Sequence, residues 1–307
     1  MNSKVSNLSQ LVSVRRYILR DGKEAGLDVI DCDTGKIRFL VNVTKACDIM
    51  QLYHMGQNVS FISKNGFSNQ NMPFLNRFEG GMLYTCGIDS IGDRDGFEPH
   101  GTLHNTPAKI ISTRVDENGI VIEAEISVSS LYSENLVLRR IITANTGGES
   151  LRIDDVLCNN GYKDEKYCLL YHVNVGYPML DDGAEIIADV AEFKPRTKYA
   201  EDRKSEMYKI TDAYLDEEEC CYFLNLNYPR IALVNRKIGK TLKLSYSGNT
   251  LQHFVEWKSM VKGDYALGLE PCTSELDGGF TYRAIRPSER IGFSINIEVK
   301  KAIRKQK

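Results

Sequence analysis

The stretch Gly119–Val128, GIVIEAEISV, indicates the fold class because its side chains alternate strictly between apolar and polar. Ile122, Ala124, Ile126 and Val128 fall on one face, and Glu123, Glu125 and Ser127 fall on the other. This two-residue period is that of a β-strand with one buried face. The segments Leu136–Ala144 and Leu151–Leu157 repeat the pattern, with the turn residues NTGGES between them. Together the three segments predict an antiparallel meander.

Short apolar segments with turn signals continue on both sides of this meander. In Leu27–Asn42, LDVIDCDTGKIRFLVN, two apolar runs flank the turn sequence Asp-Thr-Gly, which predicts a hairpin. Further strands are expected in Asp48–Ile62 with a bend at Gly56, in Tyr222–Leu226, in Arg230–Asn235 and in Ile291–Val299. The last segment alternates again, as expected for a long strand with one wet face.

Helical periodicity is nearly absent from the rest of the chain. Only Ser6–Leu19 has a roughly helical apolar spacing, which predicts a short helix or an arm within about the first 25 residues. Residues 181–219 are polar and are expected to form loops or a peripheral excursion, and residues 300–307 a solvated basic tail. Since no linker or break in composition divides the chain, residues 1–307 are interpreted as one large all-β domain with antiparallel sheets.

Composition restricts the partners. The chain of 307 residues has 39 Lys and Arg against 41 Asp and Glu, a net charge of -2, which argues against nucleic acid and polybasic membrane contact. The eight cysteines show no Cys-x-x-Cys spacing, and reduced thiols in a cytoplasmic protein fit this pattern. No secretory signal or membrane span is predicted. We therefore expect a small-molecule partner, and a homodimer is compatible with the sequence.

The glycine-rich stretch Asn76–Ala108, NRFEGGMLYTCGIDSIGDRDGFEPHGTLHNTPA, is typical of a functional loop region. It contains Arg77, Asp89, His100 and His104, a bidentate donor, an acceptor and two groups that titrate near neutral pH. These groups suit a polyhydroxylated ligand. The alternative is a long surface loop with incidental polar residues.

Two further residues could transfer protons. His172 lies in CLLYHVNVGYPML, where an apolar strand runs into polar residues including Asn174, so it is either a general acid or a semi-buried structural histidine. Glu270 ends an apolar alternation immediately before Pro271. If it is buried, its pKa is raised towards the range of a general base; otherwise it is a surface glutamate at a strand end.

Metal and thiol chemistry are weaker interpretations. His100 and His104 have a His-x-x-x-His spacing, but glycine and proline nearby oppose a helix and no third ligand is evident. Cys86 could be a nucleophile paired with one of these histidines, although sequence cannot show that pairing. No metal and no cofactor are expected.

Four ordered motifs resemble those of the aldose 1-epimerase (galactose mutarotase-like) superfamily. They are NRFEGG from Asn76, EPHG from Glu98, YHVN from Tyr171 and LGLEP from Leu267. The segments GGMLYTCG and HGTLHNTPA are similar to those of its divergent bacterial branch, the DUF4432-like proteins. The likeness extends from about Asp48 to the final strand and implies a β-supersandwich with an open sugar-binding cleft.

The resemblance also implies roles for individual residues. Glu270 would take the proton from the anomeric hydroxyl, and His172 would protonate the ring oxygen. Asn76, Arg77 and His100 would bind the sugar. Opening of the ring, rotation about the C1–C2 bond and closure would then give the other anomer.

The sequence departs from the superfamily pattern in two respects. A further sugar-binding aspartate of the superfamily has no match between Asn174 and Glu270. The segment TCGIDSIG has no counterpart, so Cys86 and Asp89 are expected to face a different ligand. Trp257, in FVEWK, is predicted to offer an apolar platform to a sugar.

The resulting hypothesis is an isomerase that interconverts the anomers of an aldose or aldose derivative. A non-catalytic sugar-binding or sensing protein, or an isomerase or lyase of an acidic sugar, would use the same fold.

Overall fold

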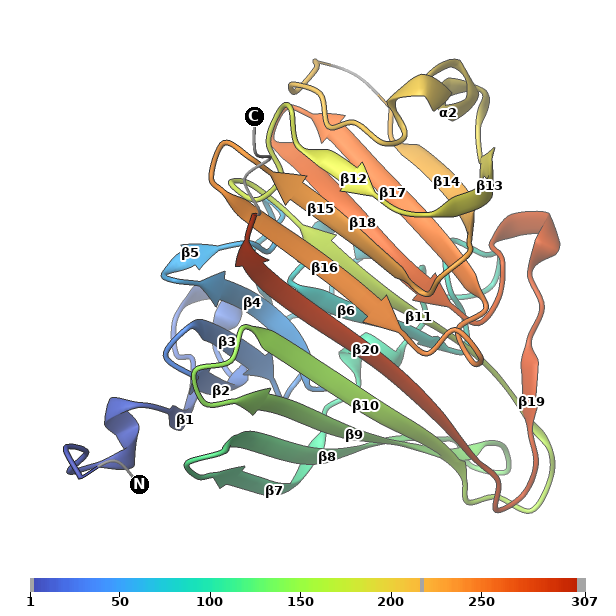
Figure 1. Ribbon diagram of the computed structural model, residues 1–307. Coiled ribbons are helices and arrows are strands. Elements are labelled where there is room, and N and C mark those ends of the chain that lie inside the picture. Colours follow the sequence, from blue (N-terminus) through green and yellow to red (C-terminus); the bar gives the residue numbers. More distant parts are fainter. Residues whose placement is uncertain (1–2, 216–217, 303–307) are drawn as a thin grey trace.

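Three antiparallel sheets contain about half of the residues in the computed structural model, which describes residues 3–215 and 218–302 (Figure 1). The largest has eight strands in the order β12-β15-β16-β20-β10-β9-β8-β7. Its strands are β7 (Lys109–Val115), β8 (Gly119–Ser129), β9 (Asn135–Asn145), β10 (Ser150–Asn159), β12 (Glu185–Ile187), β15 (Arg230–Asn235), β16 (Lys240–Tyr246) and β20 (Arg290–Lys301).

The predicted meander is confirmed as β8, β9 and β10 of this sheet. Ile122 pairs with Ile142, Ile142 with Ile153, and Ile153 with Ile295. This register places four buried isoleucines in one row across four strands. Because side chains alternate along each strand, the row fixes which face of the sheet is covered.

The second sheet has seven strands and carries the candidate site. Its order is β13-β14-β17-β18-β11-β19, and β6 also pairs with β11. The strands are β6 (Leu83–Ile88), β11 (Glu165–Val175), β13 (Val190–Pro195), β14 (Cys220–Leu226), β17 (His253–Val261), β18 (Asp264–Cys272) and β19 (Arg283–Ile285).

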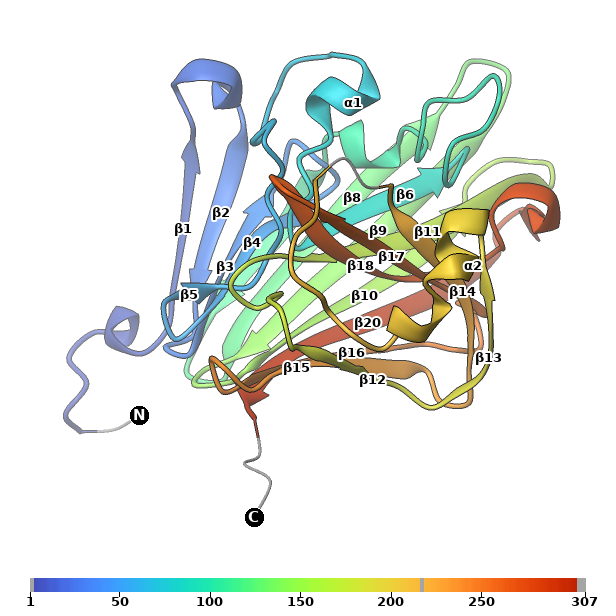
Figure 2. The same cartoon turned by 90° about the horizontal axis from the view of Figure 1, so that it is seen from above.

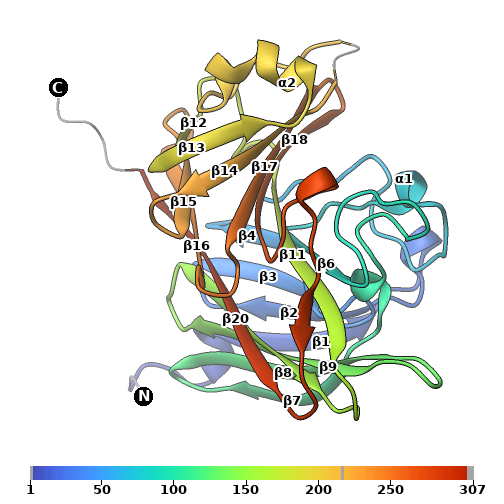
Figure 3. The ribbon, with the colours of Figure 1, turned by 90° about the vertical axis from the view of Figure 1, so that its right-hand side faces the viewer.

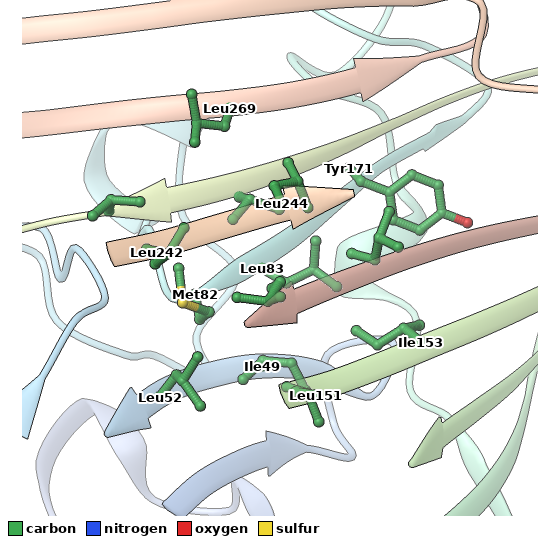
Figure 4. Close-up of a cluster of buried hydrophobic side chains, with 14 of the residues drawn as sticks. Ile49, Leu52, Met82, Leu83, Leu151, Ile153, Tyr171, Leu242, Leu244 and Leu269 are labelled. Atoms are coloured by element: carbon green, nitrogen blue, oxygen red, sulfur yellow. The ribbon is translucent and has the colours of Figure 1, made fainter. Parts of the chain in front are cut away.

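The main core lies between this sheet and the eight-stranded sheet. Figure 4 shows Leu83, Tyr171 and Leu269 among side chains from β10 and β16, and all three are buried. Tyr171 directly precedes His172, and Leu269 directly precedes Glu270. Strand alternation therefore directs His172 and Glu270 to the opposite, outer face of the seven-stranded sheet.

The third sheet contains β1 (Ser13–Ile18), β2 (Asp28–Asp33), β3 (Ile37–Asn42), β4 (Asp48–His54) and β5 (Gln57–Asn58), in that order. It lies beside the other two in the view from above (Figure 2). The predicted hairpin is confirmed: β2 and β3 pair, and Gly35 has φ +88°, which glycine adopts without steric cost.

The predicted N-terminal helix is wrong. The chain forms a 3-10 turn, Leu8–Gln10, capped by Asn7, and then strand β1 at the edge of the third sheet. Pairing of β1 with β2 and a cross-strand ion pair between Arg16 and Asp28 outweigh the loose helical spacing.

Residues 181–219 form a peripheral excursion as expected, with β12, β13 and helix α2 (Lys198–Asp202) (Figure 3). The other α-helix is α1 (Phe74–Arg77), and the remaining 3-10 turns are Gly22–Glu24, Leu103–Asn105, Lys204–Glu206 and Asp277–Gly279. Of the predicted basic tail, Lys300 and Lys301 belong to β20, and residues 303–307 lie outside the described residues. Within the described ranges, no helix has the length and apolarity needed to cross a membrane.

Candidate active site

His172 on β11 and Glu270 on β18 meet on the outer face of the seven-stranded sheet. The register that pairs Asn174 with Gly268 places His172 opposite Glu270. The imidazole Nε2 lies 3.2 Å from carboxylate Oε1 of Glu270. The two residues are only 3% and 2% exposed. The structure therefore brings together the two groups that the sequence predicted as acid and base.

Gly268 makes room for this pair. A Cβ atom at this position would lie 2.2 Å from Oε1 of Glu270 and 3.0 Å from Cε1 of His172. Any larger residue would displace the carboxylate or the imidazole. Glycine is needed here for close approach of side chains, since β18 is otherwise a regular strand.

Burial drives both members of the pair towards their neutral forms. Desolvation raises the pKa of Glu270 well above its ordinary value of 4.5, and the nearby charge of Glu219 adds to the effect. Desolvation lowers the pKa of His172 well below 6.5, and His100 lowers it further. The ligand-free pair is thus a carboxylic acid beside a neutral imidazole.

Aromatic side chains surround the imidazole. Ring centroids of His100, Trp257 and Phe78 lie 5.4, 5.5 and 5.6 Å from that of His172. These three residues are half-buried, and together they form the aromatic rim of the pair. The indole Nε1 of Trp257 donates to Glu219 at 2.6 Å, which leaves the ring faces of Trp257 apolar.

His100 is held in place by the glycine-rich region. Its backbone has φ +62°, its N–H donates to Gly92 and its carbonyl accepts from Gly87. The ring Nδ1 lies 3.3 Å from Sγ of Cys86. Burial lowers the pKa of His100 to about 4 and raises that of Cys86 well above 9.0. A protonated thiol beside a neutral imidazole does not favour Cys86 as a nucleophile.

Asp89 organises the loop that carries His100. Its Oδ1 accepts hydrogen bonds from the backbone N–H of Ser90 at 3.1 Å and of Thr102 at 2.9 Å. Gly101 has φ +75°, and a Cβ there would lie 2.5 Å from Asp89 Oδ1 and from two carbonyls. Asp89 therefore has a structural use in the ligand-free protein.

His104 lies in a separate, buried ionic network. Its Nδ1 is 2.7 Å from Asp48 and its Nε2 is 3.3 Å from Glu79. Asp48 also binds Arg140 at 2.6 Å. The ring of Tyr84 stacks on His104 with centroids 3.6 Å apart, on the side facing the rim. The structure thus does not bring His104 to the pair.

The remaining predicted sugar-binding residues lie in different surroundings. Asn76 is exposed on α1, and the guanidinium of Arg77 pairs with Glu98. Asn174 is buried, and its Nδ2 donates to the carbonyl oxygens of Gly80 and His172. The structure therefore groups His172, Glu270, His100 and Trp257, but not Asn76, Arg77, Asp89 or His104.

Sequence reasoning missed two residues that act on the pair, Phe78 of the rim and Arg196. Phe78 follows Arg77 and turns its ring to the imidazole, although NRFEGG drew attention only to Asn76 and Arg77. Arg196, at the end of β13, forms a bidentate pair with Asp277 at 2.7 Å, and its charge opposes the upward pKa shift of Glu270. The polar segment that contains Arg196 offered no pattern that could have identified it.

Across residues 3–215 and 218–302, no three or more His, Cys, Asp or Glu side chains are grouped as metal ligands. The chemistry available at the rim is proton transfer between a carboxyl group and an imidazole, under aromatic cover.

The sequence matches the family described as a domain of unknown function (DUF4432) over residues 24–285. No curated protein matches the chain. Several solved structures share its fold, and three of them illustrate the range of similarity.

A candidate aldose 1-epimerase from Klebsiella pneumoniae aligns with a TM-score of 0.83 at 19% identity, over 94% of this chain and 83% of that chain. A galactose mutarotase-like protein from Clostridium acetobutylicum aligns with a TM-score of 0.71 at 14% identity, over 95% of this chain and 99% of that chain. A galactose mutarotase-like protein from Lactobacillus casei aligns with a TM-score of 0.62 at 11% identity, over 89% of this chain and 100% of that chain. At these identities the similarity shows a galactose mutarotase-like fold, as the sequence motifs predicted.

Proposed function

The chain belongs to the DUF4432 family, and on this premise we propose that it interconverts the anomers of an aldose or aldose derivative. One observation carries the proposal. A buried carboxyl group and a buried imidazole lie 3.2 Å apart at the floor of an aromatic rim. The descriptions of several proteins with this fold, which name aldose 1-epimerase or galactose mutarotase, support the same reaction class.

The reaction needs one proton removed and one delivered at two oxygens bonded to the same carbon. Glu270 takes the proton from the anomeric hydroxyl, and the carbonyl C=O bond forms as the bond from C1 to the ring oxygen breaks. His172 delivers a proton to the departing ring oxygen. Rotation about the C1–C2 bond and the reverse transfers close the ring as the other anomer, with both groups restored.

The neutral resting pair is one proton transfer away from the reactive form. For Glu270 to act as base, its proton must move to Nε2 of His172, which lies 3.2 Å from Oε1 but is not aligned for a hydrogen bond in the ligand-free protein, so substrate binding must align the pair. Sugar hydroxyls that donate to the carboxylate would favour this ion-pair form, because hydrogen bonds to a charged carboxylate stabilise it. The free enzyme therefore avoids a buried charge until substrate is bound.

The rim supplies the positioning. Trp257 and Phe78 present apolar ring surfaces of the kind that pack against a sugar face. His100 stays neutral near pH 7, because its pKa is about 4, and can orient a hydroxyl by hydrogen bonding. Orientation of this kind brings the anomeric oxygens within reach of both proton-transfer groups.

The test is the rate of anomer exchange measured by saturation-transfer NMR across a panel of aldoses and uronic acids. We expect acceleration for at least one sugar, and a loss of about 10³-fold in Glu270→Gln and in His172→Gln. Glu192→Gln, which changes an exposed carboxylate on β13, should retain full activity.

Binding measurements separate the alternatives. An enzyme with Glu270→Gln should still show sugar-induced shifts in its protein NMR spectrum. Shifts in the wild type without acceleration of any sugar would contradict the proposal and identify a sugar-binding protein instead.

A further inference from the structure

A polar cavity lies away from the catalytic pair and shares no residue with it or with its rim. It has a volume of about 300 Å³ and is lined by Thr44, Lys45, Arg77 and four carboxamide side chains, among them Asn71 and Asn105. This volume lies at the lower end of the range for small-molecule sites. Its lining is dominated by hydrogen-bonding groups, whereas ligand pockets are usually mostly apolar.

Lys45 contributes a charge that no direct ion pair balances. It is only 7% exposed, and its Nζ donates to Oδ1 of Asn105 at 2.7 Å. Among the described residues, no carboxylate lies within ion-pair distance of this ammonium; Glu79 acts on its charge from farther away and is itself paired with His104. A buried ammonium with unused donors is costly unless an anion or another acceptor completes its surroundings.

Arg77 adds a second donor whose charge is already paired. It is 8% exposed, and its NH1 donates to Asn71 at 3.3 Å and to the carbonyl of Met72 at 3.0 Å. Glu98 pairs with its NH2. The buried Nε has no hydrogen-bond partner. The cavity therefore has one positive charge, that of Lys45, without an ion-pair partner.

We propose that this cavity is a second ligand site, for a small hydroxylated anion. The phosphate or carboxylate of the ligand binds beside Lys45, and its hydroxyl groups bind to the carboxamides, which both donate and accept. A neutral sugar would leave the Lys45 charge without an ion pair. The inference does not rest on the proposed function, because none of these residues belongs to the catalytic pair or its rim.

The test is isothermal titration of the full chain with glucose 6-phosphate, gluconate, inorganic phosphate and glucose. We expect one hydroxylated anion to bind with 1:1 stoichiometry more tightly than inorganic phosphate does. Preference for glucose 6-phosphate over gluconate would identify a phosphate as the anionic group, and the opposite order a carboxylate. Trp257→Ala removes an apolar platform of the rim and should still bind this anion unchanged, which separates the cavity from the catalytic pair.

Variants locate the binding. Lys45→Met removes the charge at similar length, and we expect it to weaken anion binding by about tenfold or more. Asn71→Asp keeps an acceptor for Arg77 but adds a negative charge, and should weaken binding as well. Lys64→Met, at an exposed position paired with Asp264, is the matched control and should bind normally.

Thermal melting without ligand shows whether each variant is folded. Binding that persists unchanged in folded Lys45→Met and Asn71→Asp would overturn the proposal. So would the absence of binding by both hydroxylated anions at millimolar concentration, or tighter binding of glucose than of either.

Discussion

His104 and His172 are both buried beside a carboxylate, yet their protonation states differ. His104 lies 2.7 Å from Asp48 and 3.3 Å from Glu79, and the net effect raises its pKa. His172 lies 3.2 Å from Glu270, and its pKa falls well below 6.5. Distance to a carboxylate therefore does not decide whether a buried histidine is charged.

The difference lies in what holds the carboxylate. Burial alone would raise the pKa of Asp48, but Arg140 at 2.6 Å and hydrogen bonds from His104 and Thr85 outweigh it and lower the pKa. Arg140 is itself fixed by Asp155 at 2.7 Å. Asp48 is thus a charged acceptor that favours the protonated form of His104.

Glu270 has no such support. Oε1 of Glu270 has no hydrogen-bond partner of good geometry. The negative charge of Glu219 raises the pKa of Glu270 further, and the charge of Arg196 opposes this effect only weakly. The proton stays on the carboxyl group, and His172 stays neutral. A fully paired network fixes its protons, whereas an unsupported pair does not, and the proposed proton transfer requires a pair of the second kind.

The largest expected effect comes from breaking the paired network. Arg140→Met should lower the free energy of unfolding by about 3–5 kcal/mol, because it leaves buried carboxylates without their cation. Urea unfolding followed by fluorescence measures the loss. Arg139→Met is the matched control: this neighbour on β9 forms an exposed pair with Glu125 and should change stability by less than about 1 kcal/mol. Equal losses in the two variants would contradict the comparison.

A smaller effect is expected from crowding the unsupported pair. Gly268→Ala places a methyl group against Glu270 and His172, and we expect kcat for anomer exchange to fall by about 10- to 100-fold, as 1 Å displacements of reacting groups can do. Gly292→Ala on β20, where a new Cβ would meet only a carbonyl oxygen at 4.0 Å, should leave kcat unchanged. Full activity of folded Gly268→Ala would argue against the catalytic geometry.

Much of the fold could be predicted because a strand with alternating apolar and polar residues shows which of its faces is buried. Gly119–Val128 and Ile291–Val299 have this alternation, and both lie in the eight-stranded sheet. The strand β1 could not be predicted, since its apolar residues fit a helical spacing and only pairing with β2 decides the outcome. The local residue pattern shows which face of a strand is buried, but only long-range pairing decides whether a segment such as β1 is a strand at all.

The site shows the same division. His172 and Glu270 both follow apolar strand segments, so the sequence could predict that each lies on or at the end of a strand. Their contact could not be predicted, because it depends on the register between β11 and β18. The sequence could not show that the side chain of Arg77 points away from the pair, and that the ring of the adjacent Phe78 lies against His172 in its place. Arg196 comes near the pair only through the pairing of β13 with β14.

The smallest effect, and the one that most sharpens the comparison, is the pH dependence of stability in Glu270→Gln. Because the folded-state pKa of Glu270 is raised above 4.5, folded and unfolded wild type both hold the proton below that pH. As the pH rises towards the folded-state pKa, only the unfolded chain releases it, and the wild type loses stability. Glutamine cannot ionise, so the variant avoids this loss.

We therefore expect Glu270→Gln to match the wild type near pH 4 and to be more stable by about 1 kcal/mol at pH 8, as for other substitutions that relieve a functional site. Urea midpoints measured across this range provide the check.

The stability of Asp48→Asn relative to the wild type should depend on pH in the opposite sense. The lowered pKa of Asp48 means that its carboxylate stabilises the fold above pH 3.8 and loses that effect as the pH falls. A gain for Asp48→Asn, or a loss for Glu270→Gln that grows with pH, would show that the two carboxylates have been assigned the wrong charges.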